Sequence, residues 1–192
     1  MLLRSLIICC VLGILTGVSA AAETLKFELD PGKSVVEFGF AATLHKVDGH
    51  LAARQGTIEV NPATGEARGW ILLDAGTAFT DNRRRDRKMH EKILESPRFP
   101  DIVYSIDRVS GGIRAVGRSE LQLHGTLEFH GVKRPFSVIA VALSDGKRLT
   151  ATGSVEVPYL EWGLKDPSFF LLRVAKKVTV RLNVSGTLTT VP

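Results

Sequence analysis

The chain has 192 residues, of which 44% are hydrophobic and 23% are charged, and its formal net charge at pH 7 is +5. This length suits one domain with a sizeable core, and so small a charge does not indicate a nucleic-acid partner. Both cysteines, Cys9 and Cys10, lie in a segment that we expect to be removed. The mature protein would then have no disulfide, cysteine nucleophile or thiolate metal site.

That segment, residues 1–20, has the features of a secretory signal peptide in their usual order. One basic residue, Arg4, precedes an apolar run from Leu6 to Leu15, and small residues follow the run. A membrane-spanning anchor would need about 20 apolar residues in a row. We expect cleavage after Ala20 or Ala22, a single mature domain over 21–192, and an exported protein, periplasmic in preference to secreted.

Apolar and polar residues alternate in short segments along the mature chain. In 119–130, Leu123 and Leu127 share the apolar face, whereas His124 and His130 fall on the polar face, where we expect solvent exposure. Such a period of two predicts half-buried strands. The expected strands are 24–29, 34–43, 50–60, 67–74, 101–109, 119–129, 133–143, 148–157 and 174–186.

Turn signals separate these segments at short intervals, as at Asp30-Pro31-Gly32 and Asp145-Gly146. Regularly punctuated short strands predict an all-β sandwich or barrel. Eight or nine antiparallel strands suit a closed barrel, whose lumen at that strand number holds one small ligand. Small residues at the inward positions Gly125, Ala151 and Gly153 favour a lumen that side chains fill only in part.

One segment, 82–95, interrupts the alternation with helix-forming residues. Asp81 or Asn82 can cap its N-terminus, and Pro97 follows its end. On a helix, Met89 and Ile93 share a face with Asp86 and His90. We expect a short helix that lies across the barrel with its two apolar residues inward.

The residues that catalysis or metal binding would need form no recognisable motif. The chain has no Gly-x-Ser-x-Gly elbow, and its five histidines contain no His-x-His or His-x-x-x-His pair. Asp86 and His90 could form a hydrogen-bonded couple, although a polar brace between helix and barrel rim is the simpler interpretation. His45 could donate to the polar head of a ligand or hold a bend. We expect no catalytic residue, metal or cofactor.

A basic cluster of Arg83, Arg84, Arg85, Arg87 and Lys88 begins the predicted helix. It could meet anionic lipid head groups or phosphate, or it could be the solvated face of the helix. Proteins that bind single-stranded nucleic acid also need aromatic residues, and none is interleaved here. A transient contact with a membrane surface therefore stays open, and a nucleic-acid partner is not expected.

Four segments in order resemble YceI-like proteins. These are Ser34 to Phe38 with Leu44-His45, then 82–102 (from Asn-Arg-Arg-Arg-Asp-Arg-Lys-Met-His to Pro-Asp-Ile), then Gly125 to Pro135, and Trp162-Gly163-Leu164. The resemblance covers nearly all of the mature chain. It implies an extended antiparallel lipocalin-like β-barrel of about eight strands with one short helix over the barrel, and a lumen that takes a polyisoprenoid. The compact segment 164–170 departs from the larger branch of the family.

We therefore expect an exported protein that holds a long isoprenoid lipid, a polyprenyl or quinone tail, in an apolar lumen for transport or storage. The expected ligand-binding residues are Val36, Phe38, Phe40, Leu44, His45, Met89, Ile93, Phe99, Leu123, Leu127, Phe129, Val155 and Trp162. By strand alternation, the residues expected to line the tube are Val36, Phe38, Phe40, Leu123, Leu127, Phe129 and Val155. Met89 and Ile93 of the helix, together with Phe99 and Trp162, are expected to cover it or shape one end.

Two alternatives remain open on the sequence. An enzyme could act on an isoprenoid or quinone substrate through His45 or through the Asp86 and His90 couple. A structural barrel could instead bind another exported protein with its outer surface. A homodimer is compatible with each of these functions.

Overall fold

The structure, a computed structural model, describes residues 23–43, 46–168 and 173–191. The predicted signal peptide, its cleavage positions and the expected ligand-binding residues Leu44 and His45 lie outside these residues. Within the described part of the chain, no helix is long and apolar enough to cross a membrane.

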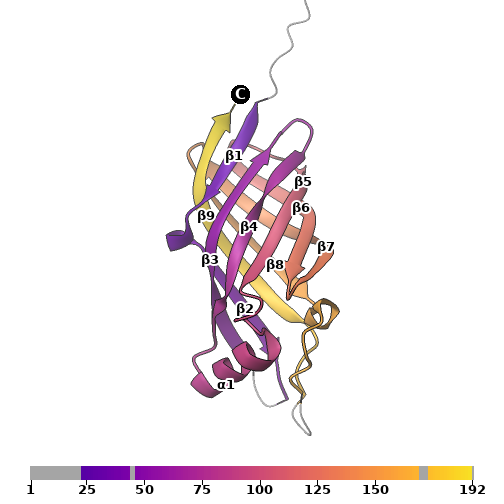
Figure 1. Cartoon of the computed structure of the whole chain (residues 1–192). Helices are drawn as coiled ribbons and strands as arrows, with labels where there is room; N and C mark the ends of the chain where they lie inside the picture. The colour runs from indigo at the N-terminus through magenta and orange to yellow at the C-terminus, as the bar shows by residue number, and fades with distance from the viewer. Residues whose placement is uncertain (1–22, 44–45, 169–172, 192) are drawn as a thin grey trace, which may run out of the picture.

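Nine antiparallel strands make up most of the described chain (Figure 1). They are β1 (Thr24–Leu29), β2 (Val35–Ala41), β3 (Lys46–Val60), β4 (Glu66–Phe79), β5 (Asp101–Gly111), β6 (Val116–Phe129), β7 (Val132–Asp145), β8 (Arg148–Val157) and β9 (Val178–Val191). The helical elements are η1 (Pro31–Lys33), α1 (Arg83–Lys88), η2 (Met89–Ile93) and η3 (Tyr159–Trp162). Two expected strands, 24–29 and 148–157, have the expected bounds, the expected strand 34–43 is shorter, and the others are longer or shifted.

The nine strands close into a barrel with eight strand positions, because β1 and β2 share one position end to end. Both strands lie between β3 and β9: β1 pairs with the C-terminal halves of these two long strands, and β2 pairs with their N-terminal halves. Pairing of β3 with β4 completes the ring. The predicted antiparallel barrel of about eight strands is therefore confirmed.

Side-chain hydrogen bonds stabilise the turn between β1 and β2. The Asp30 carboxylate accepts a hydrogen bond from the Gly32 N–H at 3.1 Å and so caps η1. The Ser34 hydroxyl donates to the Asp30 carbonyl and accepts from the Ser185 N–H at 3.1 Å. Because backbone groups released from the ladder find these partners, the chain can change strand without leaving buried polar groups unpaired.

The helix α1 lies at one end of the barrel, which we call the helix end (Figure 1). The Asn82 side chain caps α1 by accepting from the Arg85 N–H at 3.0 Å, as the sequence predicts. At Met89 the helix widens into the π-turn η2, where the Leu94 N–H donates to the Met89 carbonyl at 2.8 Å. β1 begins and β9 ends at the opposite end of the barrel.

Pairing between β7 and β8 runs only from Ser144↔Leu149 to Ala140↔Gly153. From there to the helix end the described residues of the two strands are not paired. The η3 turn packs at this place, with the Trp162 ring edge-to-face against Phe136 at 5.9 Å between centroids. A helical turn thus replaces strand pairing in the wall of the barrel.

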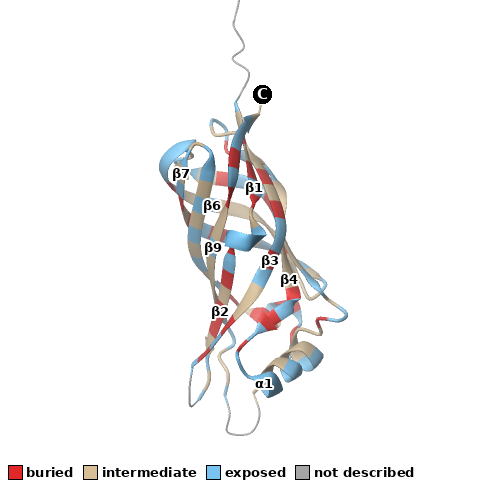
Figure 2. Ribbon diagram, turned by 90° about the vertical axis from the view of Figure 1, so that its left-hand side faces the viewer, coloured by how far each residue is buried: buried red, intermediate tan, exposed pale blue. Residues whose placement is uncertain are grey.

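Burial follows the alternation along most strands (Figure 2). The phase changes at bulges, such as the one between Ile106 and Arg108 in β5 and the one between Ala53 and Gln55 in β3. At a bulge one extra residue is inserted, so the inward positions change from even to odd numbers or the reverse.

Candidate functional site

The barrel encloses a cavity of about 700 Å³. All nine strands contribute to its lining, and most of the lining residues are apolar. It extends from Arg84 and Lys88 at the helix end to Ile113 and Arg114 at the opposite end. This volume lies within the range of about 300–1,000 Å³ that is usual for ligand sites, so side chains do not fill the barrel.

Most of the expected ligand-binding residues lie in this lining. The strand residues are Val36, Phe38, Phe40, Leu123, Leu127, Phe129 and Val155, and the helix residues are Met89 and Ile93. They come from β2, β6, β8 and η2, and the barrel brings their side chains around one continuous space.

Trp162 does not line the cavity but supports its wall from behind. Its side chain is only 2% exposed, and its indole Nε1–H donates to the Leu127 carbonyl at 3.2 Å. It belongs to a buried cluster with Leu127, Val157, Tyr159 and Leu164. Gly163, at φ 77°, ends the turn in the left-handed region that favours glycine. Trp162 therefore shapes the helix end of the lumen without reaching it.

Phe99 also lies outside the lining. Its ring packs on the His130 ring with 4.2 Å between centroids and on the Gly131 backbone, and Arg98 lies 4.9 Å over it. It thus fastens the segment before β5 to the β6–β7 hairpin. His130 is half-buried as a result, and so is His124, which contacts the Ser110 and Ser137 hydroxyls. The expected solvent exposure of the two histidines was wrong.

The small inward residues have two different roles. Ala151 and Gly153 line the cavity, as expected from their size. Gly125 does not, because a Cβ at this position would lie 1.9 Å from the Ser105 carbonyl oxygen. The expectation that Gly125 leaves lumen space was wrong, because this glycine lets β5 and β6 approach closely.

Tyr104 is a polar residue in the lining whose hydroxyl faces protein. The hydroxyl is within donating distance of two carbonyl oxygens, that of Leu123 at 2.9 Å and that of Phe136 at 3.3 Å. Burial, with a smaller contribution from Asp107, raises the pKa of Tyr104. The hydroxyl therefore stays protonated, and the lumen keeps its apolar character at this point.

Asp86 and His90 attach the helix to the end of β4. The Asp86 carboxylate accepts from the Thr80 N–H at 2.9 Å and from the Thr80 hydroxyl. His90 Nε2 donates to the Ala78 carbonyl at 2.8 Å, since that oxygen can only accept, and Nδ1 lies 2.9 Å from the Ser96 hydroxyl. Neither Asp86 nor His90 lines the cavity. Their geometry is that of the polar brace that the sequence indicates.

Basic side chains line the cavity at the helix end, a placement that was not predicted from the sequence. Asn82, Arg84, Arg85 and Lys88 all line it there. Their signal was present in the basic cluster, and Arg85 lies four residues before Met89, a spacing that puts both on one side of a helix. Among the described residues, no group of three or more His, Cys, Asp or Glu could hold a metal ion.

Comparison with known proteins agrees with this architecture. The family model described as the YceI-like domain matches residues 27–186. No curated protein matched the sequence.

Several solved structures share the fold. A polyisoprenoid-binding domain from Saccharophagus degradans superposes with a TM-score of 0.68 at 14% identity, over 85% of this chain and 98% of that chain. BcnA from Burkholderia cenocepacia gives 0.65 at 12% identity, over 82% and 98%. The YceI protein of Campylobacter jejuni gives 0.57 at 16% identity, over 76% and 86%. At these identities the likeness shows the fold alone.

Proposed function

The chain belongs to the YceI-like family, and from this premise we propose that it is an exported protein that holds one long isoprenoid lipid in its barrel for transport or storage. One observation carries the proposal: a continuous apolar cavity of about 700 Å³ that runs along the barrel. The printed description of the Saccharophagus degradans domain as polyisoprenoid-binding supports the choice of ligand class.

The physical reason is the hydrophobic effect. Each five-carbon isoprene unit that leaves water for an apolar lumen gains about 4 kcal/mol gross, at about 0.8 kcal/mol per carbon, before the cost of ordering the chain. Methyl-branched, unsaturated units pack well against branched and aromatic side chains such as those of Val36, Phe38 and Leu127. The length of the chain that fits the lumen then dominates the affinity.

The proposed role is binding without turnover. The enzyme alternative needs a reactive group beside the ligand. Asp86 is instead hydrogen-bonded to Thr80, and His90 is hydrogen-bonded to Ala78 and Ser96. His45, the other candidate, lies outside the described residues. We assign no catalytic residue and no cofactor.

The experiment is extraction of a lipid from vesicles. The protein is incubated with vesicles that contain a long-chain prenyl quinone, the vesicles are pelleted, and the quinone in the supernatant is measured and identified by mass spectrometry. We expect unaltered quinone in a stoichiometric complex with the protein. A supernatant without quinone would refute the proposal, and a converted quinone whose formation His90→Ala abolishes would replace it with the enzyme alternative.

A further inference from the structure

We propose that the outer side of α1 is a docking surface for membranes rich in anionic phospholipid, and that docking turns the helix end of the barrel toward the bilayer. The purpose of this contact rests on the proposed function, because a protein that takes a lipid from a membrane has to approach it with the cavity facing the lipid. The contact itself is measured on membranes without any isoprenoid.

The side chains of α1 divide between two sides of the helix. At about 100° per residue, four cations fall within an arc of about 140°. They are Arg83, Arg84, Arg87 and Lys88, and all four are exposed. The other side fastens the helix to the end of β4, because the Arg85 guanidinium donates to the Thr80 hydroxyl at 2.6 Å and the Asp86 carboxylate accepts from the Thr80 N–H at 2.9 Å. The cationic side therefore faces away from β4.

Nearby acids do not neutralise these cations. Within the described part of the chain, none of the four takes part in an ion pair. Five of the exposed charged residues in 81–92 are basic, and two, Asp81 and Glu91, are acidic. Asp86 and Glu95 are half-buried and hydrogen-bonded within the protein. The outer side of the helix thus presents a surplus of positive charge.

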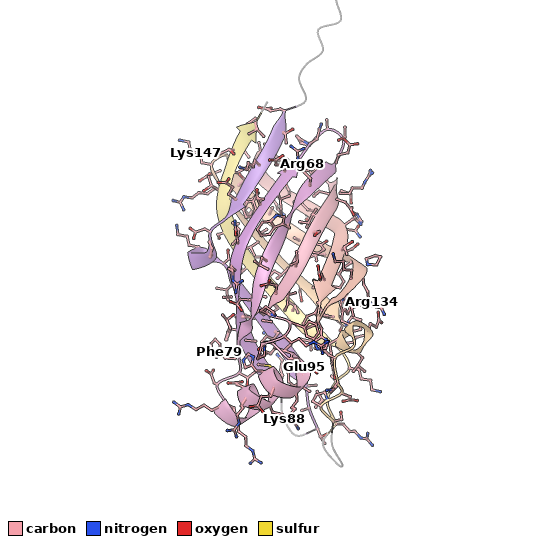
Figure 3. The ribbon with its side chains drawn as sticks, in the orientation of Figure 1. Arg68, Phe79, Lys88, Glu95, Arg134 and Lys147 are labelled. Atoms are coloured by element: carbon pink, nitrogen blue, oxygen red, sulfur yellow. The ribbon has the colours of Figure 1, made fainter. Side chains whose placement is uncertain are left out.

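The cationic side of α1 adjoins an opening of the cavity, which we call its mouth. Arg84 and Lys88 line the cavity and are also exposed, so they lie at this mouth. Arg83 and Arg87 are exposed on the same helix and do not line the cavity. Figure 3 shows Lys88 on the helix end of the barrel. A flat anionic surface that meets the four cations therefore lies close to the mouth.

The composition of the surface favours a membrane over a protein partner. The exposed residues of 81–92 are all polar or charged, whereas a protein interface usually has an apolar or aromatic core. A negatively charged bilayer needs no such core, because each Lys or Arg near its surface raises the affinity by about fivefold. This attraction reaches only about 10 Å at 0.1 M salt. We therefore expect the docking to be reversible and sensitive to salt.

The opposite end of the barrel provides a matched control. Lys147 and Arg148 lie at the turn between β7 and β8, and both are exposed. Figure 3 shows Lys147 at the end away from Lys88. Like Arg83 and Arg87, these two cations do not line the cavity and form no ion pair with a described residue. Replacing either pair by glutamine removes the same charge from the protein.

The test measures co-sedimentation of the wild type, R83Q/R87Q and K147Q/R148Q with two kinds of vesicle. One kind is phosphatidylcholine alone, and the other is an equal mixture of phosphatidylcholine and phosphatidylglycerol. We expect the wild type to bind the mixed vesicles in preference to the neutral ones, and to lose this binding as the salt concentration approaches about 1 M. R83Q/R87Q should bind the mixed vesicles about tenfold or more weakly, and K147Q/R148Q should bind them nearly as the wild type does.

A second measurement connects docking to the proposed function. The same vesicles are loaded with a long-chain prenyl quinone, and the rate at which each protein extracts it is recorded. We expect R83Q/R87Q to extract quinone more slowly than the wild type from the mixed vesicles. From the neutral vesicles the two proteins should be equal, because Arg83 and Arg87 do not line the cavity. Circular dichroism verifies that the variants are folded.

Three results would overturn the proposal. A wild type that sediments equally with both kinds of vesicle has no docking surface for anionic lipid, and quinone extraction from the neutral vesicles would then leave the proposed function standing. An equal loss in the two variants would assign the binding to net charge rather than to α1. Normal docking without extraction from either kind of vesicle would refute the proposed function, and with it the role of docking in lipid uptake.

Discussion

A carboxylate in the middle of the lumen should weaken lipid binding by an amount that the structure allows us to calculate. Leu123 lies near the middle of β6, where it pairs with Val109 of β5 and Val138 of β7, and it lines the cavity. Leu123→Asp therefore places an ionisable group against the ligand tail without a partner. A group in this position becomes neutral rather than staying charged in an apolar medium.

The cost of that neutralisation sets the size of the effect. Protonating an aspartate whose ordinary pKa is about 3.9 costs about 4 kcal/mol at pH 7, since each pH unit is worth about 1.4 kcal/mol. In the empty barrel water can reach the carboxylate, so most of this cost is added when the lipid enters. We expect lipid affinity to fall by up to about a thousandfold at pH 7 but by only about tenfold near pH 5.

The assay is equilibrium lipid binding at both pH values, with circular dichroism to verify the fold. Gln122→Asp is the matched control, because Gln122 is exposed on the outer face of the same strand. This control should bind as the wild type does at both pH values. If Leu123→Asp bound lipid normally at pH 7, or if its deficit did not shrink on acidification, Leu123 would not face the ligand.

Three further predictions concern the groups that hold the site in shape. Trp162→Phe removes the donor to the Leu127 carbonyl and should lower the free energy of unfolding by about 1–2 kcal/mol in urea titrations; unchanged stability would contradict this. The wild type should lose stability as pH rises above 10.0, because the unfolded chain ionises Tyr104 there while burial raises its pKa in the folded protein. Tyr104→Phe should lack this component, and an equal loss in both proteins would refute it. Asp86→Ala leaves the buried Thr80 N–H unpaired and should speed hydrogen exchange of the α1 amides, whereas the exposed Glu91→Ala should not.

Regular alternation is the part of the sequence that predicts the fold and the lumen best. In β6, Leu123, Leu127 and Phe129 keep one phase throughout the strand, and all three line the cavity. Val36, Phe38 and Phe40 in β2 behave in the same way. A period of two needs only local geometry, so it can be read without knowledge of neighbouring strands.

Alternation alone does not predict where a bulge changes the inward-facing positions of a strand from even to odd residue numbers. In β5, Ile102 and Tyr104 line the cavity before the bulge and Val109 lines it after the bulge. The bulge arises from pairing with β6, so a single strand gives little sign of it. Tyr104 itself follows the alternation of the expected strand, and that signal could have identified it.

The helix end was the hardest part to predict, because tertiary contacts determine which of its side chains face the cavity. An ideal helix puts Asp86, Met89, His90 and Ile93 on one face, but in the structure Met89 and Ile93 line the cavity while Asp86 and His90 bind the end of β4. The π-turn at Met89–Ile93 changes the number of residues per turn and so separates the two pairs. The buried position of Trp162 likewise depends on the gap between β7 and β8, and no local sequence pattern indicates that gap.

The most direct test of a lipid-filled barrel is native mass spectrometry of the full protein, purified without detergent or organic solvent from the cells that make it. We predict an additional mass that an organic extract identifies as an isoprenoid, and its disappearance from Leu123→Asp but not from Gln122→Asp. A bare protein mass, together with failure to take up any prenyl lipid supplied in vesicles, would contradict the account.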